Sequence, residues 1–234
     1  MSIWGKLGAA ELLVSGPIGA LLGNRVALDK PENKREHAEN DVAFTVGVIA
    51  LAAKMAKADG VVTKDEVKAF KSAFKVSDAE MKQGARVFNL AKQNVDGYED
   101  CAEQLTIVFK GNRKMLEDLL DVLFHIAKAD AALHPSEQEF LGEVAKRFGL
   151  SDAQFAAIRA RHVVAAKRDP YEVLGLKPSA SDAELEDRYR ALLAENRPDE
   201  LIGRGVPPEF IAIAIEKVAA FTEAYKAVAK PREL

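Results

Sequence analysis

The chain has 234 residues, of which 48% are hydrophobic, enough to bury one large core or two modest ones. Its 33 basic and 36 acidic side chains give a formal net charge of −3, which argues against nucleic acid as a partner because phosphate binding requires clustered Lys and Arg. The single cysteine, Cys101, excludes an intramolecular disulfide bond and favours a reducing compartment, so the cytoplasm is the expected location.

Helix is the secondary structure that the composition favours along the whole chain. Ala, Leu, Glu and Lys are abundant, and no run of alternating β-branched residues occurs. We therefore predict an all-α protein. Changes in composition divide it into a glycine-rich N-terminal segment at residues 1–28, a helical domain of about seven helices at residues 40–166, and a three-helix unit at residues 167–234. The charged segment at residues 29–41 is interpreted as a linker.

The N-terminal segment is apolar, and its length decides how it is interpreted. A membrane-spanning helix needs about 20 apolar residues. The charge-free run from Leu12 to Asn24 has 13 residues, follows Glu11 and is interrupted by Gly16-Pro17. A soluble N-terminus is therefore favoured, and peripheral or anchored association with a membrane through this segment is the alternative.

An internal repeat marks the helical domain. Residues 56–66 (AKADGVVTKDE) recur as residues 127–137 (AKADAALHPSE), so each copy predicts the same unit of helix, Asp-containing turn and helix. Thr63 and Glu66 have the spacing of a capping box after the first turn, and Pro135 takes the first helical position after the second. The repeat indicates a helical bundle built by duplication.

Start and stop signals define three helices in the last unit. Asp169-Pro170 begins the first helix, Gly175 ends it, and Ser181 opens the second helix with a capping box. Because proline disfavours a helical conformation in the residue before it, the second helix is expected to end near Asn196, just ahead of Pro198. A third apolar helix follows, so this segment is expected to form the tip of a helical hairpin.

The last unit resembles the J domain of DnaJ-type co-chaperones. The residues that carry this resemblance are DPYEVLGL at 169–176, YRAL at 189–192 and the Pro-Asp pair at 198–199. The loop at 201–210 (LIGRGVPPEF) is similar to that of the DjlA-like family of bacterial membrane-anchored J proteins. The repeat-bearing domain resembles the TerB-like helical domain that this family carries ahead of its J domain. The resemblance covers nearly the whole chain, and it implies that any membrane association would be with the bacterial inner membrane.

The resemblance implies a functional site at the hairpin tip. In the J family a His-Pro-Asp tripeptide stimulates ATP hydrolysis by a DnaK-type chaperone, which is therefore the implied partner. Pro198 and Asp199 match this tripeptide, but Arg197 stands where the family has histidine. A guanidinium group is larger than an imidazole, always charged and without an acceptor atom. We expect Arg197 to pair with Asp199 and compete for the carboxylate that a partner arginine would need.

The second helix also departs from the family, which uses a basic face there to dock the chaperone. Residues 182–195 carry five acidic and two basic side chains, a net charge of 2 − 5 = −3. Arg188 and Arg190 are the two basic residues that remain as candidate chaperone contacts. An acidic helix would slow the encounter with an acidic chaperone surface.

Two alternatives to a co-chaperone stay open at this point. The J-like unit could be a scaffold that no longer stimulates a chaperone, and the TerB-like domain, whose own partner is unknown, could sense a metal ion or a stress ligand. The spacing of its acidic residues does not match an EF-hand loop, and capping already explains both glutamates. The candidate metal ligands are Asp59, Asp65, Glu66, Asp130 and Glu137. No phosphate-binding loop or nucleophile–base pair is visible, so we expect neither enzyme activity nor a cofactor.

Overall fold

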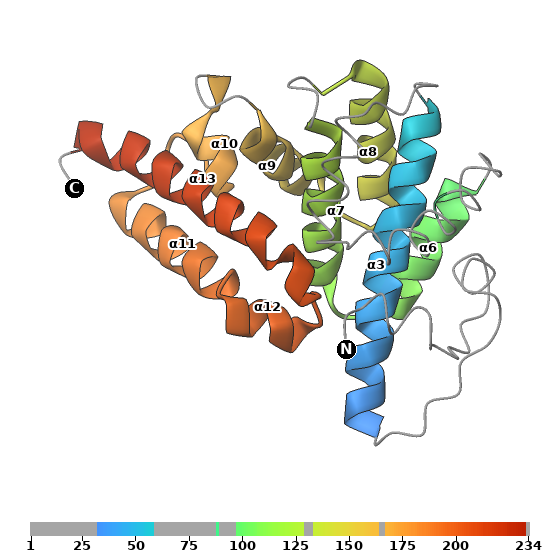
Figure 1. The fold of residues 1–234 in the computed structure, drawn as a ribbon. Coiled ribbons are helices and arrows are strands. Elements are labelled where there is room, and N and C mark those ends of the chain that lie inside the picture. Colours follow the sequence, from blue (N-terminus) through green and yellow to red (C-terminus); the bar gives the residue numbers. More distant parts are fainter. Residues whose placement is uncertain (1–31, 59–87, 89–96, 129–132, 164–166, 233–234) are drawn as a thin grey trace.

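The protein is all-α in every part that the structure describes. The computed structural model describes residues 32–58, 88, 97–128, 133–163 and 167–232, and the regular elements within these ranges are all helical (Figure 1). The fold-class prediction is confirmed. The elements are α3 (Glu32–Ala58), α6 (Tyr98–Val108), α7 (Arg113–Ala127), α8 (Pro135–Arg147), α9 (Asp152–His162), α10 (Pro170–Leu174), α11 (Asp182–Glu195), α12 (Pro198–Arg204), η3 (Pro208–Phe210), α13 (Ile211–Ala229) and η4 (Lys230–Arg232).

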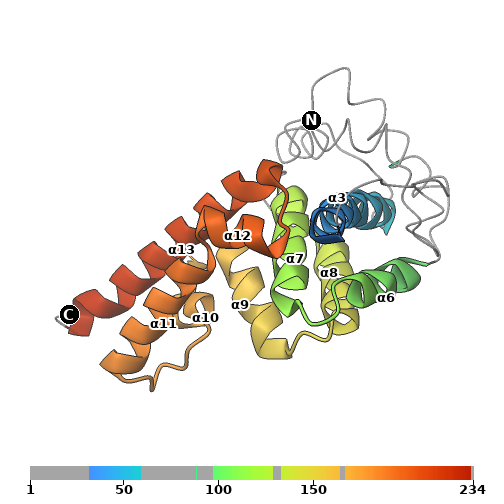
Figure 2. The same cartoon turned by 90° about the horizontal axis from the view of Figure 1, so that it is seen from below.

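Helix α3 packs against α6, α7 and α8 in the larger bundle (Figures 1 and 2). Gly47 permits the close approach of α6, because a Cβ atom there would lie 2.6 Å from a methyl carbon of the buried Leu105. Residues 43–56 of α3 are all buried, so burial extends beyond the single face that the spacing of four, three and four residues predicts. The positions of that predicted face are Phe44, Val48, Leu51 and Met55.

The linker predicted at residues 29–41 is wrong from Glu32 onward, where α3 begins. Seven of the 13 residues in this segment are strong helix formers: three Glu, two Lys, one Arg and one Ala. It also continues a helix that the core already stabilises, and extending a helix costs far less than starting one. The N-terminal segment 1–28 and the first-copy turn with Thr63 lie outside the described residues. Among the helices that are described, none has the length and apolar character needed to cross a membrane.

In the C-terminal unit, α10, α11 and α13 surround a second, smaller core, to which Ala160 of α9 also contributes. Helices α11 and α13 run antiparallel, and α10 contacts both (Figure 1). The rings of Tyr189 and Tyr225 stack 4.2 Å apart between α11 and α13. The predicted helix signals operate as expected at Ser181, which forms a capping box, and at Gly175, which ends α10 with a φ of 68°. The larger side chains of this core are Val173, Leu174, Leu185, Leu192, Phe221 and Val228.

The loop predicted at residues 201–210 is helical in its first part, which corrects the sequence interpretation. Helix α12 starts with Pro198 at its first position and ends at Gly205, whose φ of 94° is the left-handed conformation that glycine tolerates. Both signals stand in the sequence only seven residues apart, a length below that of typical helices. The hairpin tip is therefore a short helix, and the tripeptide lies at its start.

The C-terminal unit packs tightly against the bundle through α12, η3 and the first turns of α13. The apolar side chains of this region belong to the same continuous core as α3, α6, α7 and α8, and the rings of Phe210 and Phe44 lie 5.1 Å apart. Figures 1 and 2 show this end of α13 beside α7. The shared core side chains are Leu201, Val206, Phe210, Ile213 and Ala214.

Candidate functional site

The tripeptide Arg197-Pro198-Asp199 lies at the exposed start of α12. Arg197 is the residue before the helix and has an extended backbone, with φ −67° and ψ 143°, as the following proline requires. Its carbonyl oxygen accepts the first helical hydrogen bond from Leu201 N, at 3.0 Å. The three side chains are exposed, so a partner can reach them.

Arg197 and Asp199 form the ion pair that the sequence predicts. Nε of Arg197 donates to Oδ1 of Asp199 at 3.1 Å, and Nη2 donates to Oδ2 at 3.0 Å. Their side chains are 65% and 62% exposed. Exposed pairs contribute only about 0 to 1 kcal/mol. The carboxylate is thus occupied from within the chain, but by a contact that a partner cation can replace.

The two arginines of α11 already have partners inside the protein. Arg188 is half-buried, and its Nε donates to the Leu174 carbonyl oxygen at the end of α10, at 3.0 Å. Arg190 is exposed and pairs with Glu186 and Asp187 on its own helix. The expected basic face is therefore reduced further: Arg188 stabilises the unit, and the charge of Arg190 is offset by two neighbouring carboxylates.

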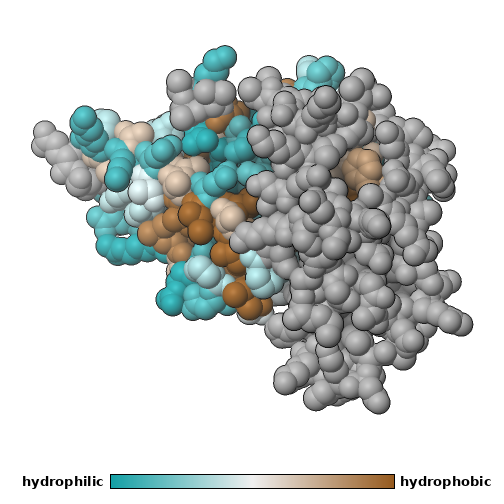
Figure 3. All heavy atoms as spheres, viewed as in Figure 1, coloured by the Kyte–Doolittle hydropathy of each residue, from teal (hydrophilic) through white to brown (hydrophobic). Residues whose placement is uncertain are grey.

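The surface around α12 and α13 combines polar and apolar side chains. On the face seen in Figure 3, hydrophilic side chains cover most of the C-terminal unit, and apolar side chains surface along the part next to the bundle. Ile202 on α12 and Ile215 on α13 are 48% and 65% exposed. A partner that contacts the tripeptide would meet Ile202 on the same short helix.

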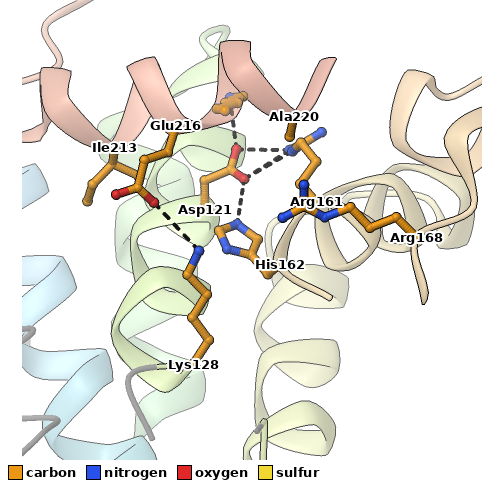
Figure 4. A pocket seen from close by; sticks show the side chains of 9 residues that line it. Asp121, Lys128, Arg161, His162, Arg168, Ile213, Glu216 and Ala220 are labelled. Atoms are coloured by element: carbon orange, nitrogen blue, oxygen red, sulfur yellow. Dashed lines mark hydrogen bonds and ion pairs between the residues drawn. The ribbon is translucent and has the colours of Figure 1, made fainter. Parts of the chain in front are cut away.

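A second polar cluster lies at the interface between the bundle and the C-terminal unit (Figure 4). Asp121 on α7 is buried and accepts hydrogen bonds from both Nε and Nη2 of Arg161, at 2.9 to 3.2 Å. Nε2 of His162 lies 3.0 Å from the same carboxylate, and Nζ of Lys217 on α13 lies 2.8 Å from it. One carboxylate thus joins three helices, α7, α9 and α13. The cluster lines a pocket of about 60 Å³ with Lys128, Arg168 and Glu216.

The interface fixes the charge states of its members. Burial opposes ionisation of Asp121, but the charges of Arg161 and Lys217 outweigh it and hold the pKa of this carboxyl well below its usual range. Burial likewise opposes the charge on Lys217, and Asp118 and Asp121 nevertheless raise its pKa. For His162 burial dominates over the nearby carboxylate and lowers the pKa to about 4. At neutral pH the imidazole is therefore neutral and donates to Asp121 through Nε2.

Asp118, one turn before Asp121 on α7, extends this cluster toward α12. Its Oδ1 lies 2.9 Å from Nζ of Lys217, and its Oδ2 accepts a hydrogen bond from Nη2 of Arg204 at 2.7 Å. Sequence reasoning missed both aspartates. The signal that could have found them is their place inside the apolar run 115–126, because acidic residues on a buried helix face require partners.

Of the five acidic residues proposed as metal ligands, Glu137 lies within the described residues. Glu137 is buried, and its carboxylate accepts a hydrogen bond from His134 N at 2.8 Å, completing the capping box of α8. The candidates Asp59, Asp65, Glu66 and Asp130 lie outside the described residues. Within the described ranges, no three His, Cys, Asp or Glu side chains are grouped so as to hold a metal ion.

Cys101 behaves as a buried apolar side chain. It is 1% exposed on α6, and burial raises the pKa of its thiol to about 12. A thiol in this state is a poor nucleophile, because the thiolate is the reactive form.

Comparisons with known proteins show what the chain is similar to. Residues 45–160 match the family model of the tellurite resistance protein TerB. Three curated relatives carry the name co-chaperone protein DjlA: the protein of Vibrio cholerae is 29% identical, covering 83% of this chain and 80% of its own length. That of Coxiella burnetii is 25% identical, covering 95% and 94%, and that of Escherichia coli K12 is 23% identical, covering 97% of both chains. The chain is a DjlA-like protein with a TerB-like domain.

The match to TerB covers the bundle of the DjlA-like protein from the middle of α3 to α9. The match to the DjlA proteins continues through the C-terminal unit, since two of these relatives align over 95% or more of the chain. The relatives are named co-chaperones and not enzymes. No solved structure matches the chain.

Proposed function

We propose that the DjlA-like protein is a DnaJ-type co-chaperone whose C-terminal unit, residues 167–234, is a J domain that contacts a DnaK-type chaperone. The single observation that carries this proposal is the exposed Arg197-Pro198-Asp199 tripeptide at the junction between the antiparallel helices α11 and α13. The names of the full-length relatives support it independently.

The geometry indicates how the tripeptide engages its partner. Pro198 fixes the backbone at the start of α12. The Asp199 side chain is exposed, and within the described residues its carboxylate accepts hydrogen bonds from Arg197 alone. A cation of the chaperone that displaces Arg197 gains the carboxylate at a small cost, because the exposed pair that it breaks contributes at most about 1 kcal/mol. Arg197 itself then becomes free to contact an acidic group of the partner.

The TerB-like bundle acts, in this proposal, as the module that recruits a further partner or senses a stress signal. Its match to a family model of its own supports a role distinct from chaperone contact. We place the protein in the cytoplasm, with anchoring at the inner membrane through residues 1–28 as the alternative. Fractionation of cells into membrane and soluble pools distinguishes these two locations.

The test is the ATPase rate of the DnaK-type chaperone from the same organism, measured with and without the full-length protein. Wild type is expected to stimulate hydrolysis. Asp199→Asn keeps the shape of the side chain but removes the charge that the partner cation requires, so the stimulation should fall at least about tenfold. Glu200→Gln, the same change at the adjacent exposed position, is the matched control and should preserve stimulation. Absence of both stimulation and chaperone binding by wild type would rule the proposal out.

The ion pair between Arg197 and Asp199 favours a second candidate, a scaffold that binds without stimulating. If the pair withholds the carboxylate completely, only Arg197→His should produce stimulation, because an imidazole cannot form the two-point contact. In the co-chaperone proposal the same variant stimulates at least as well as wild type. The two candidates therefore predict different chaperone ATPase rates with the wild-type protein, and both predict stimulation by Arg197→His.

A further inference from the structure

Helix α12 is exposed at one end and anchored to the TerB-like bundle at the other. Its last residue, Arg204, is mostly buried and contacts two other helices: Nη1 donates to the Glu195 carbonyl oxygen at the end of α11, at 2.7 Å, and Nη2 donates to Asp118 on α7, at 2.7 Å. The carbonyl oxygen of Arg204 in turn accepts a hydrogen bond from the Asn112 side chain, at 3.2 Å. The end of α12 is thus fixed by the side chains of Asp118 on α7 and of Asn112, the residue that caps α7, and by the end of α11.

The contacts that anchor the end of α12 involve charged side chains, are mostly shielded from solvent and adjoin the hydrophobic core. Asp118 is 9% exposed, and Lys217 bridges it to Asp121 through contacts of 2.9 and 2.8 Å. Leu201, in the middle of α12, is 1% exposed and belongs to the core of the bundle. Hydrogen bonds to charged groups in such surroundings are stronger and more directional than exposed ones.

Because α12 is short, the orientation of the tripeptide depends on the contacts that anchor this helix. A helix of seven residues is only about 10 Å long. Helices shorter than about 12 residues are marginal in water without tertiary contacts. The helical state of α12, and with it the direction of the Asp199 carboxylate in its first turn, therefore depends on the contacts that hold Leu201 and Arg204.

We propose that Asp118 and Arg204 are positioning residues through which the TerB-like bundle holds the tripeptide in the orientation that the chaperone recognises. The proposal rests on the proposed function for the chaperone contact, whereas its structural part, the dependence of α12 on the bundle, stands by itself. It gives the bundle a second role, because anything that displaces α7 would change the presentation of the tripeptide without touching it.

Amide hydrogen exchange of the full-length protein tests the structural part directly. Asp118→Asn keeps the side-chain volume but removes the charge that holds Arg204. Exchange of the amides at residues 201–206 should accelerate at least about tenfold, which corresponds to a loss of 1.4 kcal/mol, whereas exchange in α8 should stay unchanged. Glu103→Gln, which removes the exposed pair of Glu103 with Arg147 between α6 and α8, is the matched control. Unchanged protection at residues 201–206 would overturn the inference.

A titration of the chaperone ATPase with the same variants tests the functional part. Asp118→Asn should raise the half-saturating concentration about tenfold and leave the maximal rate nearly unchanged, because the ordering of α12 is then completed only on binding. Arg204→Lys, which keeps the charge but loses the two-point contact, should fall between wild type and Asp118→Asn. If both variants titrate like wild type, the positioning role is wrong. If wild type neither binds nor stimulates, the proposed function fails, and the exchange experiment still decides whether the bundle anchors α12.

Discussion

Replacing Asp121 by alanine is expected to lower the free energy of unfolding by about 3 to 5 kcal/mol, the range found when one partner of a buried ion pair is removed. The variant leaves Arg161 and Lys217 buried, at 8% and 10% side-chain exposure, with their shared carboxylate gone. Domains are typically stable by about 5 to 15 kcal/mol. The substitution would therefore remove a large fraction of the free energy of unfolding and weaken the contact between α7, α9 and α13.

Urea denaturation followed by circular dichroism measures this effect. Asp187→Ala is the matched control, since the Asp187 side chain is 81% exposed and has only a distant contact with Arg190. It should change the free energy of unfolding by no more than about 0.5 kcal/mol. A cost below about 1 kcal/mol for Asp121→Ala would show that the cluster is hydrated and that the interface does not depend on it.

Acidification from pH 7 to pH 4 is expected to destabilise the protein by about 3 kcal/mol through His162 alone. The pKa of this imidazole is about 4 in the folded protein, against an ordinary value of 6.5, and each unit of difference corresponds to about 1.4 kcal/mol. The unfolded chain binds a proton below pH 6.5, whereas the folded chain does not until about pH 4, so stability falls as the pH falls through this window. Asp121, whose folded pKa is depressed, keeps its own contribution until the pH falls below its ordinary range.

Denaturation curves at pH 7, 5.5 and 4 separate this contribution from the others. His162→Gln removes the titrating group and retains an N–H that can reach the Asp121 carboxylate. The free energy of unfolding of the variant should decline less steeply between pH 6.5 and 4 than that of wild type. Identical pH dependence of the two proteins would contradict the assignment to His162.

Local signals were predictable from the sequence, and long-range contacts were not. The capping box at Ser181 and the left-handed glycine at Gly175 each depend on residues only a few positions away. The ion pair of Arg197 with Asp199 spans two residues and was expected for the same reason. In contrast, Asp118 pairs with a lysine 99 residues away, and Asp121 pairs with an arginine 40 residues away. In the sequence, the one sign that such partners exist is the presence of two aspartates among the apolar residues of α7.

Helix α12 shows why part of the candidate site escaped prediction. Its signals, Pro198 at the start and Gly205 at the end, also fit a turn, and seven residues are too few to form a stable helix from their own propensities. The burial of the Leu201 side chain in the core of the bundle favours the helix over the turn. The bundle and the C-terminal unit looked independent in the sequence, although their cores join at this point.

The central claim is that the start of α12 contacts the chaperone, and site-specific photocrosslinking tests it most directly. A photoreactive residue replaces Glu200, which is exposed beside the tripeptide, or Glu139, which is exposed on α8 of the bundle. We expect the protein labelled at position 200, and not the one labelled at position 139, to crosslink to the DnaK-type chaperone in the presence of ATP, and we expect Asp199→Asn to abolish the product. Equal yields from both positions, or no product from position 200, would contradict the account.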